Sequence, residues 1–137
     1  MQTYQLTEDI RVYTIAAASF PEGVKTAHEK LHALIPFSPE RKYFGISRMN
    51  ETGGISYWAA AEERVPGELA GHGLPEFIIQ SGSFRYIDIP DFMQQLPAIG
   101  KAFEQLLKDP ALDPQGYCLE WYRSMQECRC MVPLLQN

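Results

Sequence analysis

The sequence feature that most constrains the fold is an order of predicted elements that occurs twice. Residues 9–63 read as a strand, a helix and two further strands, and residues 76–134 repeat that order with little residue identity. One such unit alone would be a short sheet with a single helix, which cannot bury both of its faces. We therefore expect one α+β domain over 1–137. It would consist of duplicated strand–helix–strand–strand units in an antiparallel-rich sheet, with two helices on one side and a central ligand groove.

The elements of the first half follow from composition and spacing. β-Branched and aromatic residues predict a strand within 9–20, and the proline and acid that follow favour a helix over 22–35. Two strands are then predicted at 43–49 and 55–63. Two adjacent glycines between them supply the positive φ angles that a hairpin turn requires.

The second half follows the same course. A strand is predicted over 76–89, with a break or bulge at Ser81-Gly82. A helix over 91–108 carries its apolar residues on one stripe. The chain then ends in a hairpin over 116–133.

Length and charge bound the class of protein. The chain has 137 residues and a net charge of -5, enough for one domain with a sizeable core. No apolar run approaches the ~20 residues of a membrane span, and the N-terminus lacks a signal-peptide pattern. We therefore expect a cytoplasmic protein without membrane contact. The basic residues are scattered, which argues against direct contact with nucleic acid.

Metal and cofactor motifs are not found in the sequence. The three cysteines, Cys118, Cys128 and Cys130, fall in the last hairpin without a nearby histidine, so we expect free thiols and no metal. His28 and His32 lie four residues apart and could chelate a metal, but no third ligand is near, so a solvent-facing or helix-side pair is favoured. No phosphate-binding loop, dinucleotide fingerprint, zinc-protease motif or Ser-His-Asp order occurs, so no cofactor is expected.

Glu120 is the one charged residue in an otherwise apolar and aromatic strand. Alternation places it on one face with Cys118 and Tyr122, whereas the other face reads as core. Burying a carboxylate among aromatic residues costs several kcal/mol unless it is paired or protonated. We interpret Glu120 as part of a pocket wall. The alternatives are a solvated edge glutamate, or a glutamate neutralised by Arg123 or Arg129.

The second strand of the first hairpin has the composition of a pocket wall as well. Alternation places Tyr57, Ala59 and Ala61 on one face, where an aromatic ring followed by small residues leaves a hollow. Alanine is a weak choice for a strand, which suggests that space is required there. The alternative is close packing of a helix against small side chains.

Aromatic residues are frequent near this predicted cleft, and about half of them are expected to be core. The remainder, around one carboxylate, suit a hydrophobic or cationic aromatic small molecule, because rings stack and attract cations while Glu120 supplies the countercharge. The predicted ligand-binding residues, besides Glu120, are Tyr57, Tyr122, Trp58, Trp121, Tyr43, Phe37 and Phe77.

Short motifs in order along the chain resemble a known family. They are Gly45-Ile46-Ser47, Tyr57-Trp58-Ala59, a glycine-led strand at 82–86, Glu120-Trp121-Tyr122 and Val132-Pro133-Leu134. Over about residues 10–134 the chain resembles the GyrI-like small-molecule-binding domain. That domain is also the effector-binding domain of many AraC- and MerR-type multidrug-sensing transcription regulators.

The resemblance implies a duplicated fold whose central groove takes hydrophobic, often cationic ligands. The ligand-contacting glutamate of the family falls on Glu120 and its groove tyrosine on Tyr57. The match is incomplete, because Ser19-Phe20-Pro21 replaces the glycine-containing turn before the first helix, and Ile89-Pro90-Asp91 stands at the equivalent turn of the second half. No helix-turn-helix segment is recognised, so a stand-alone form is expected.

Three functions are compatible with these residues. The first is a stand-alone binder of small hydrophobic or cationic ligands, with Glu120 and Tyr57 facing each other across an aromatic groove. The second follows from relatives that hydrolyse strained, cyclopropane-bearing toxins, with Glu120 as the catalytic base and Tyr57 as its positioning partner. The third is a domain that docks on a protein partner such as a gyrase.

Overall fold

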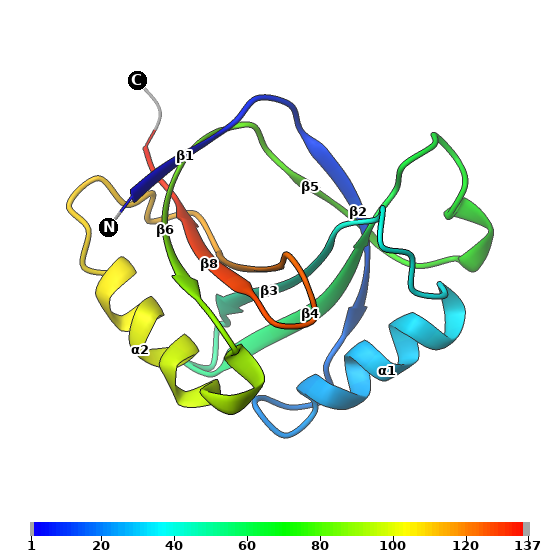
Figure 1. The fold of residues 1–137 in the computed structure, drawn as a ribbon, viewed down its shortest axis with the longest axis horizontal. Coiled ribbons are helices and arrows are strands. Elements are labelled where there is room, and N and C mark those ends of the chain that lie inside the picture. Colours follow the sequence, from blue (N-terminus) through cyan, green and yellow to red (C-terminus); the bar gives the residue numbers. More distant parts are fainter. Residues whose placement is uncertain (1, 136–137) are drawn as a thin grey trace.

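The computed structural model describes residues 2–135 and contains one antiparallel sheet with two α-helices on one of its faces (Figure 1). The strands are β1 (Gln2–Leu6), β2 (Ile10–Ala16), β3 (Tyr43–Met49), β4 (Ile55–Glu62), β5 (Glu76–Ile79), β6 (Gly82–Ile89), β7 (Cys118–Tyr122) and β8 (Cys128–Pro133). The helices are α1 (Val24–Leu34) and α2 (Leu96–Leu106), with short 3-10 helices η1 (Ala70–His72) and η2 (Phe92–Gln94). The eight strands lie in the order β1-β6-β8-β7-β3-β4-β2-β5.

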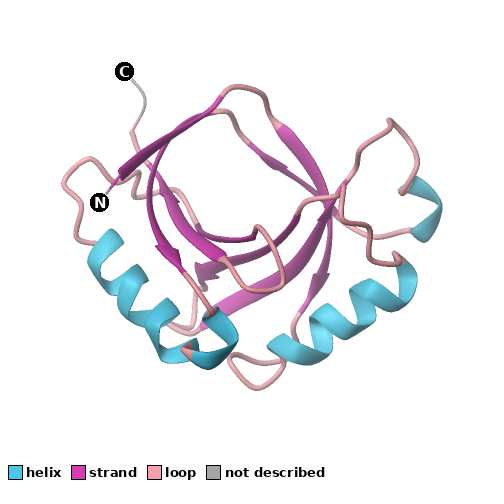
Figure 2. Ribbon diagram, in the orientation of Figure 1, coloured by secondary structure: helices cyan, strands magenta, loops and turns pink. Residues whose placement is uncertain are grey.

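The sheet is strongly curled, and its two edges approach each other on the side away from the helices (Figures 1 and 2). One buried cluster on the concave side receives at least one residue from every strand, which a flat sheet would not allow. Its buried members are Leu6, Val12, Phe44, Ile46, Ala60, Ile79, Phe84, Leu119 and Met131. The concave side is therefore a filled core.

Both helices cover the convex side of the sheet. Helix α1 buries Ala27 and Leu31 against one cluster, and α2 buries Ala102 and Leu106 against a second. The ring of Tyr122 packs against both clusters, since β7 lies near the middle of the sheet. The convex side therefore has a central strip between the areas that the two helices cover.

The α+β class and the antiparallel sheet with both helices on one side are confirmed. The elements also follow the predicted order, β2-α1-β3-β4 and then β6-α2-β7-β8. Duplication of the two units and a groove between them stay predictions. No helix within residues 2–135 has the length and apolar character needed to cross a membrane.

Strand β1 is absent from the sequence-based prediction. Its residues are mostly polar and exposed, and it is held as an edge strand by antiparallel pairing with β6, from Gln2↔Tyr86 to Leu6↔Gly82. Such a strand has little local signal because its partner lies about eighty positions further along the chain.

The strand predicted over 76–89 is interrupted next to the predicted break at Ser81-Gly82 and forms two strands, β5 and β6. The chain breaks there, and β5 pairs with β2 whereas β6 pairs with β1 and β8. Gly82 has φ 142, which side chains rarely adopt, so the glycine permits the change of direction.

The second helix also differs from its predicted span of 91–108. Residues before Gln95 form η2, and α2 begins at Leu96. Pro97 accounts for the interruption, because it has no N–H to donate and its ring would clash with the preceding turn if the helix continued. The first helix is shorter than predicted by about one residue at its end and two at its start.

Candidate functional site

The candidate site is centred on Glu120, in the strip of the convex side between the helices. Strand β7 pairs with β3 in a register that sets Glu120 opposite Gly45 and Tyr122 opposite Tyr43. Alternation sends Cys118, Glu120 and Tyr122 to the helix-covered face, as the sequence predicts.

Gly45 provides the space that the site requires. A Cβ atom there would lie 2.7 Å from Glu120 Oε1 and would overlap the hydroxyl of Tyr57. Tyr57 belongs to β4 and stands opposite Ser47 of β3. Its ring passes over Gly45 to reach the carboxylate of Glu120 on β7. The three neighbouring strands thus contribute the carboxylate of Glu120 (β7), the phenol of Tyr57 (β4) and, at Gly45 (β3), the space in which the two meet.

Both phenols bind the same carboxylate oxygen. The hydroxyl of Tyr57 donates to Glu120 Oε1 at 3.0 Å, and the hydroxyl of Tyr122 donates to it as well. The two hydroxyl oxygens are 2.9 Å apart. Tyr57 and Glu120 are therefore direct neighbours, and the prediction that they face each other across a groove is wrong in that detail.

The second carboxylate oxygen is different. Glu120 Oε2 accepts no hydrogen bond from any of residues 2–135, and it is not among the fully buried unpaired polar atoms. Glu120 itself is half-buried. Oε2 consequently keeps some contact with solvent.

Burial controls the protonation of the three groups. Loss of hydration raises the pKa of Glu120 above its ordinary value, although hydrogen bonds from Tyr122 and Tyr57 oppose the rise. Burial, and then the charge of Glu120, raises the pKa of Tyr57 and of Tyr122. Both phenols therefore keep their protons at neutral pH and act as donors.

His28 extends the cluster to helix α1. Its Nε2 lies 2.8 Å from the hydroxyl oxygen of Tyr57. Burial, and then the nearby His32, lowers the pKa of His28 to about 4, so the ring is neutral at pH 7. When Glu120 is ionised, Tyr57 donates its one hydroxyl hydrogen to the carboxylate. Its oxygen can then only accept from His28, so the hydrogen between them belongs to Nε2 of His28.

Aromatic rings surround the carboxylate. The ring centroid of Phe20 lies 5.9 Å from that of Tyr57, and those of His28 and Phe92 lie 5.3 Å and 5.6 Å from that of Tyr122. Phe20 is 39% exposed, so part of this wall faces solvent. The enclosure comes from the turn before α1, from α1 itself and from η2.

Two other predicted residues lie on the same face, one step along the sheet. Tyr43 is opposite Tyr122, and the ring of Phe37 stacks on Tyr43 with centroids 5.2 Å apart. His32 packs edge-on against Tyr43, whose hydroxyl accepts a hydrogen bond from the N–H of Ser38 at 2.8 Å. This second aromatic group continues the surface that begins at Glu120.

The remaining predicted residues lie on the other side of the sheet. Trp58, Trp121 and Phe77 pack against the concave core, where Trp121 lies near Phe44 and Phe77 meets Tyr117. The structure thus separates them from Glu120. The reason is the alternation of strands, because residues next to Tyr57 and Glu120 in sequence must point to the opposite face.

Neither arginine considered as a partner neutralises Glu120. Arg129 binds Asp88 through Nε, 2.7 Å from Oδ1, and through a second bond of 3.1 Å. Arg123 lies over the ring of Trp121, 5.1 Å from its centroid. Glu120 has no ion pair within residues 2–135.

Within residues 2–135, the side chains near the site are not grouped as in a metal centre. All three cysteines are free, and burial raises the pKa of the Cys118 thiol to about 11, which keeps it protonated and a poor nucleophile. The described part of the chain holds no group of three or more potential metal-ligating side chains.

Gly45 and His28 were not predicted as parts of this site. A glycine inside a strand often marks a close approach of another group, and Gly45 carries that signal. His28 was placed at helical spacing on the first helix and weighed as a metal ligand, but not as a partner of Tyr57; it follows the buried Ala27 on α1. Its contact with Tyr57 depends on how α1 crosses β4, which the sequence pattern does not specify.

Comparison with known proteins gives a likeness of fold. No protein family matches the sequence, and no curated protein matches it. The chain is similar in structure to an integron cassette protein from the mobile metagenome of Vibrio cholerae, with a TM-score of 0.68 and 10% sequence identity. The alignment covers 98% of this chain and 95% of that one, so the similarity extends over the whole fold.

The role of Gly45 leads to a first prediction. Gly45→Ala should lower the free energy of unfolding by about 1–3 kcal/mol, because the added methyl group overlaps the Tyr57 hydroxyl and the carboxylate. Chemical denaturation measures the change. Gly100→Ala in α2 is the matched control, since a Cβ there meets nothing and should stabilise the helix by about 0.5–1 kcal/mol. Equal effects of the two changes would contradict this view of Gly45.

The lowered pKa of His28 leads to a second prediction. Between pH 6.5 and about 4 the unfolded state binds more protons at this histidine than the folded state, so stability falls as the pH falls. His28→Gln should reduce that slope by up to about 1.4 kcal/mol per pH unit. Denaturation at a series of pH values measures it, with His72→Gln on the exposed η1 as control. An unchanged slope in His28→Gln would show that His28 is not held neutral.

Proposed function

We propose that this chain binds small hydrophobic ligands, often cationic and aromatic, which it holds over Glu120. The observation that carries the proposal is Oε2 of Glu120, a carboxylate oxygen that lacks a protein partner within residues 2–135 and lies among aromatic rings. Such an oxygen is suited to accept a charge-assisted hydrogen bond or to act as a counter-ion.

The rest of the cluster supports a ligand with both charge and apolar area. Tyr57 and Tyr122 hold Oε1, which fixes the direction of the carboxylate before any ligand binds. Phe20 and Phe92 supply ring faces for stacking and for attraction of a cation. A cation that reaches Oε2 would also offset the cost of burying the negative charge.

The proposal includes the duplicated architecture and the groove. Strand order around the β7–β3 pair supports duplication, because each strand on one side has a counterpart at the same place on the other. Glu120 lies beside the line where the two units would meet, which is a usual place for a ligand site. Membership of the GyrI-like group of domains is part of the same proposal, supported by the position of Glu120 and Tyr57.

The charge of Glu120 is the first feature to test. Glu120→Gln should weaken binding of a cationic dye such as a rhodamine by about 1–3 kcal/mol, and should weaken a neutral aromatic ligand much less. The variant should fold with equal or greater stability, since its amide oxygen can still accept from both phenols and a buried charge is removed. Acidification protonates Glu120 and removes the charge that binds the dye. Because the pKa of Glu120 is raised, the unaltered protein should lose dye affinity on acidification at a higher pH than it would with an ordinary glutamate.

Fluorescence anisotropy of the dye measures the affinity. Glu127→Gln is the matched control, because it removes one exposed negative charge from the same hairpin and should leave dye affinity unchanged. Equal dye affinity for Glu120→Gln and the unaltered protein would overturn the proposal.

A second candidate function is hydrolysis of a strained electrophilic ligand. The observation that favours it is the continuous chain of contacts from His28 through Tyr57 to Glu120, together with a raised pKa that makes Glu120 a stronger base than usual. Glu120 would remove a proton from water at Oε2 as the water oxygen bonds to a ring carbon of the ligand. The ring C–C bond would break, its electron pair would pass to the adjacent carbonyl as an enolate, and the proton held by Glu120 would return to the enolate carbon. Tyr57 would hold the carboxylate in position.

An aryl ketone that bears an activated cyclopropane distinguishes the two functions. Mass spectrometry would detect a product with one added water, formed by the unaltered protein and lost in Glu120→Gln. Binding of the ketone without any such product would leave the binder as the function and exclude the hydrolase for this substrate class.

A further inference from the structure

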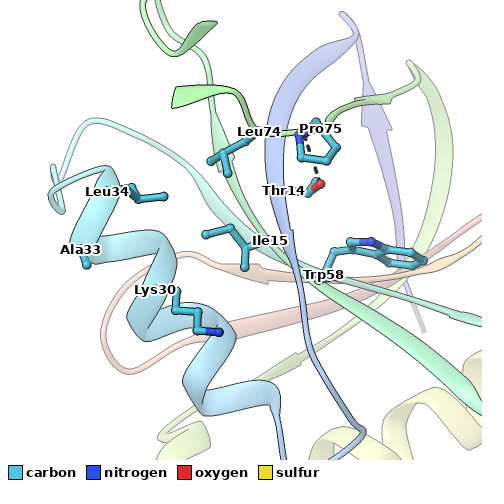
Figure 3. Close-up of a pocket in the computed structure, with 9 residues that line it drawn as sticks. Thr14, Ile15, Lys30, Ala33, Leu34, Trp58, Leu74 and Pro75 are labelled. Atoms are coloured by element: carbon cyan, nitrogen blue, oxygen red, sulfur yellow. Dashed lines mark hydrogen bonds between the residues drawn. The ribbon is translucent and has the colours of Figure 1, made fainter. Parts of the chain in front are cut away.

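A surface pocket of about 540 Å³ lies between helix α1 and the edge of strand β2 (Figure 3). Its volume is within the range of about 300–1,000 Å³ that is usual for small-molecule sites. It contains none of the residues of the Glu120 cluster. The lining residues are Thr14, Ile15, Ala16, Lys30, Ala33, Leu34, Trp58, Leu74 and Pro75.

The walls are almost entirely apolar. Leu34 projects from the last turn of α1, and Leu74 and Ile15 close the space on the sheet side (Figure 3). Trp58 of β4, which packs against the concave core, contributes to the lining from the other face of the sheet. Leu34 is 44% exposed, so an apolar ligand would cover surface that now faces water.

One backbone donor is available at the edge of β2. The N–H of Ala17 bonds to the carbonyl of Tyr57 on β4, so the N–H of Ala16 points to the opposite, outer side of β2. On that outer side the N–H of Thr14 donates to the carbonyl of Pro75. Pairing with β5 involves only the residues before Thr14, from Ile10 to Tyr13. Within residues 2–135 the sheet pairing supplies no partner on this side of Ala16, which itself lines the pocket.

Lys30 is the one charged side chain in the lining. It has no ion pair within residues 2–135, and the residues four positions before and after it on α1 are Thr26 and Leu34, which carry no charge. The lining includes no acid. In a chain with a net charge of -5, this pocket therefore combines apolar walls with an uncompensated positive charge.

We propose that the pocket binds a small amphiphilic carboxylic acid. Its apolar body lies against Ile15, Leu34 and Leu74, and its carboxylate accepts hydrogen bonds from the ammonium of Lys30 and the N–H of Ala16. This site is separate from Glu120 and has the opposite charge preference, so it goes beyond the proposed function. Charge complementarity selects a carboxylate over a neutral or cationic amphiphile.

Titration calorimetry with decanoate, decanol and decyltrimethylammonium tests the charge preference. Decanoate should bind more tightly than decanol, and the ammonium compound should bind most weakly at this site. Lys30→Gln should weaken decanoate by about threefold to tenfold, the scale of one partly exposed charged contact, and should leave decanol unchanged. Lys30→Arg should retain most of the affinity.

Two further variants keep the test specific to this pocket. Lys25→Gln removes the same charge from an exposed position of α1 outside the lining, and should leave decanoate affinity unchanged. Leu34→Glu places an acid one turn from Lys30 at an exposed position and should weaken decanoate more than Lys30→Gln does. Rhodamine affinity at Glu120 should be the same in Lys30→Gln and the unaltered protein, which separates this proposal from the proposed function.

The proposal is overturned if decanoate does not bind, or if Lys25→Gln and Lys30→Gln weaken it equally. It is also overturned if Leu34→Glu leaves decanoate affinity unchanged, or if decanoate and rhodamine compete for one site.

Discussion

The pairing of β3 with β7 is the contact on which the rest of the structure depends. These strands lie at the middle of the sheet order, and their five residue pairs join β1, β6, β8 and β7 to the remaining four strands. The same register sets Glu120 against Gly45 and directs Phe44 and Leu119 into the concave core. A shift by one residue would exchange the two faces, so fold and site are specified together.

The environment of Glu120 compensates the buried carboxylate only in part. Removing a carboxylate from water is costly, and two phenol hydroxyls offset part of that cost at one oxygen. The second oxygen is left without a protein partner, and the raised pKa reflects this incomplete compensation. A fully paired glutamate would be more stable. Arg129 instead satisfies Asp88 and covers Tyr86 on the concave side.

Much of the fold is determined by local sequence. Helical spacing of apolar residues predicted both α-helices, and β-branched and aromatic alternation predicted the strands that form the middle of the sheet. Alternation in 118–122 also assigned Glu120 and Tyr122 to one face and Leu119 to the core, because side-chain direction in a strand has a fixed period of two. A charged residue that interrupts an apolar strand was sufficient to mark the site.

What the tertiary structure alone decided is which separate segments meet. The contact of His28 with Tyr57, and the passage of Tyr57 over Gly45, depend on the crossing of α1 over β4 and on strand register. Trp58 and Trp121 were grouped with Glu120 by proximity in sequence, whereas alternation put them on the concave side. The pocket at Lys30 depends on where β5 leaves β2. Local sequence determined the elements and their faces, and long-range pairing decided their neighbours, because pairing energies come from contacts between distant residues that no local pattern records.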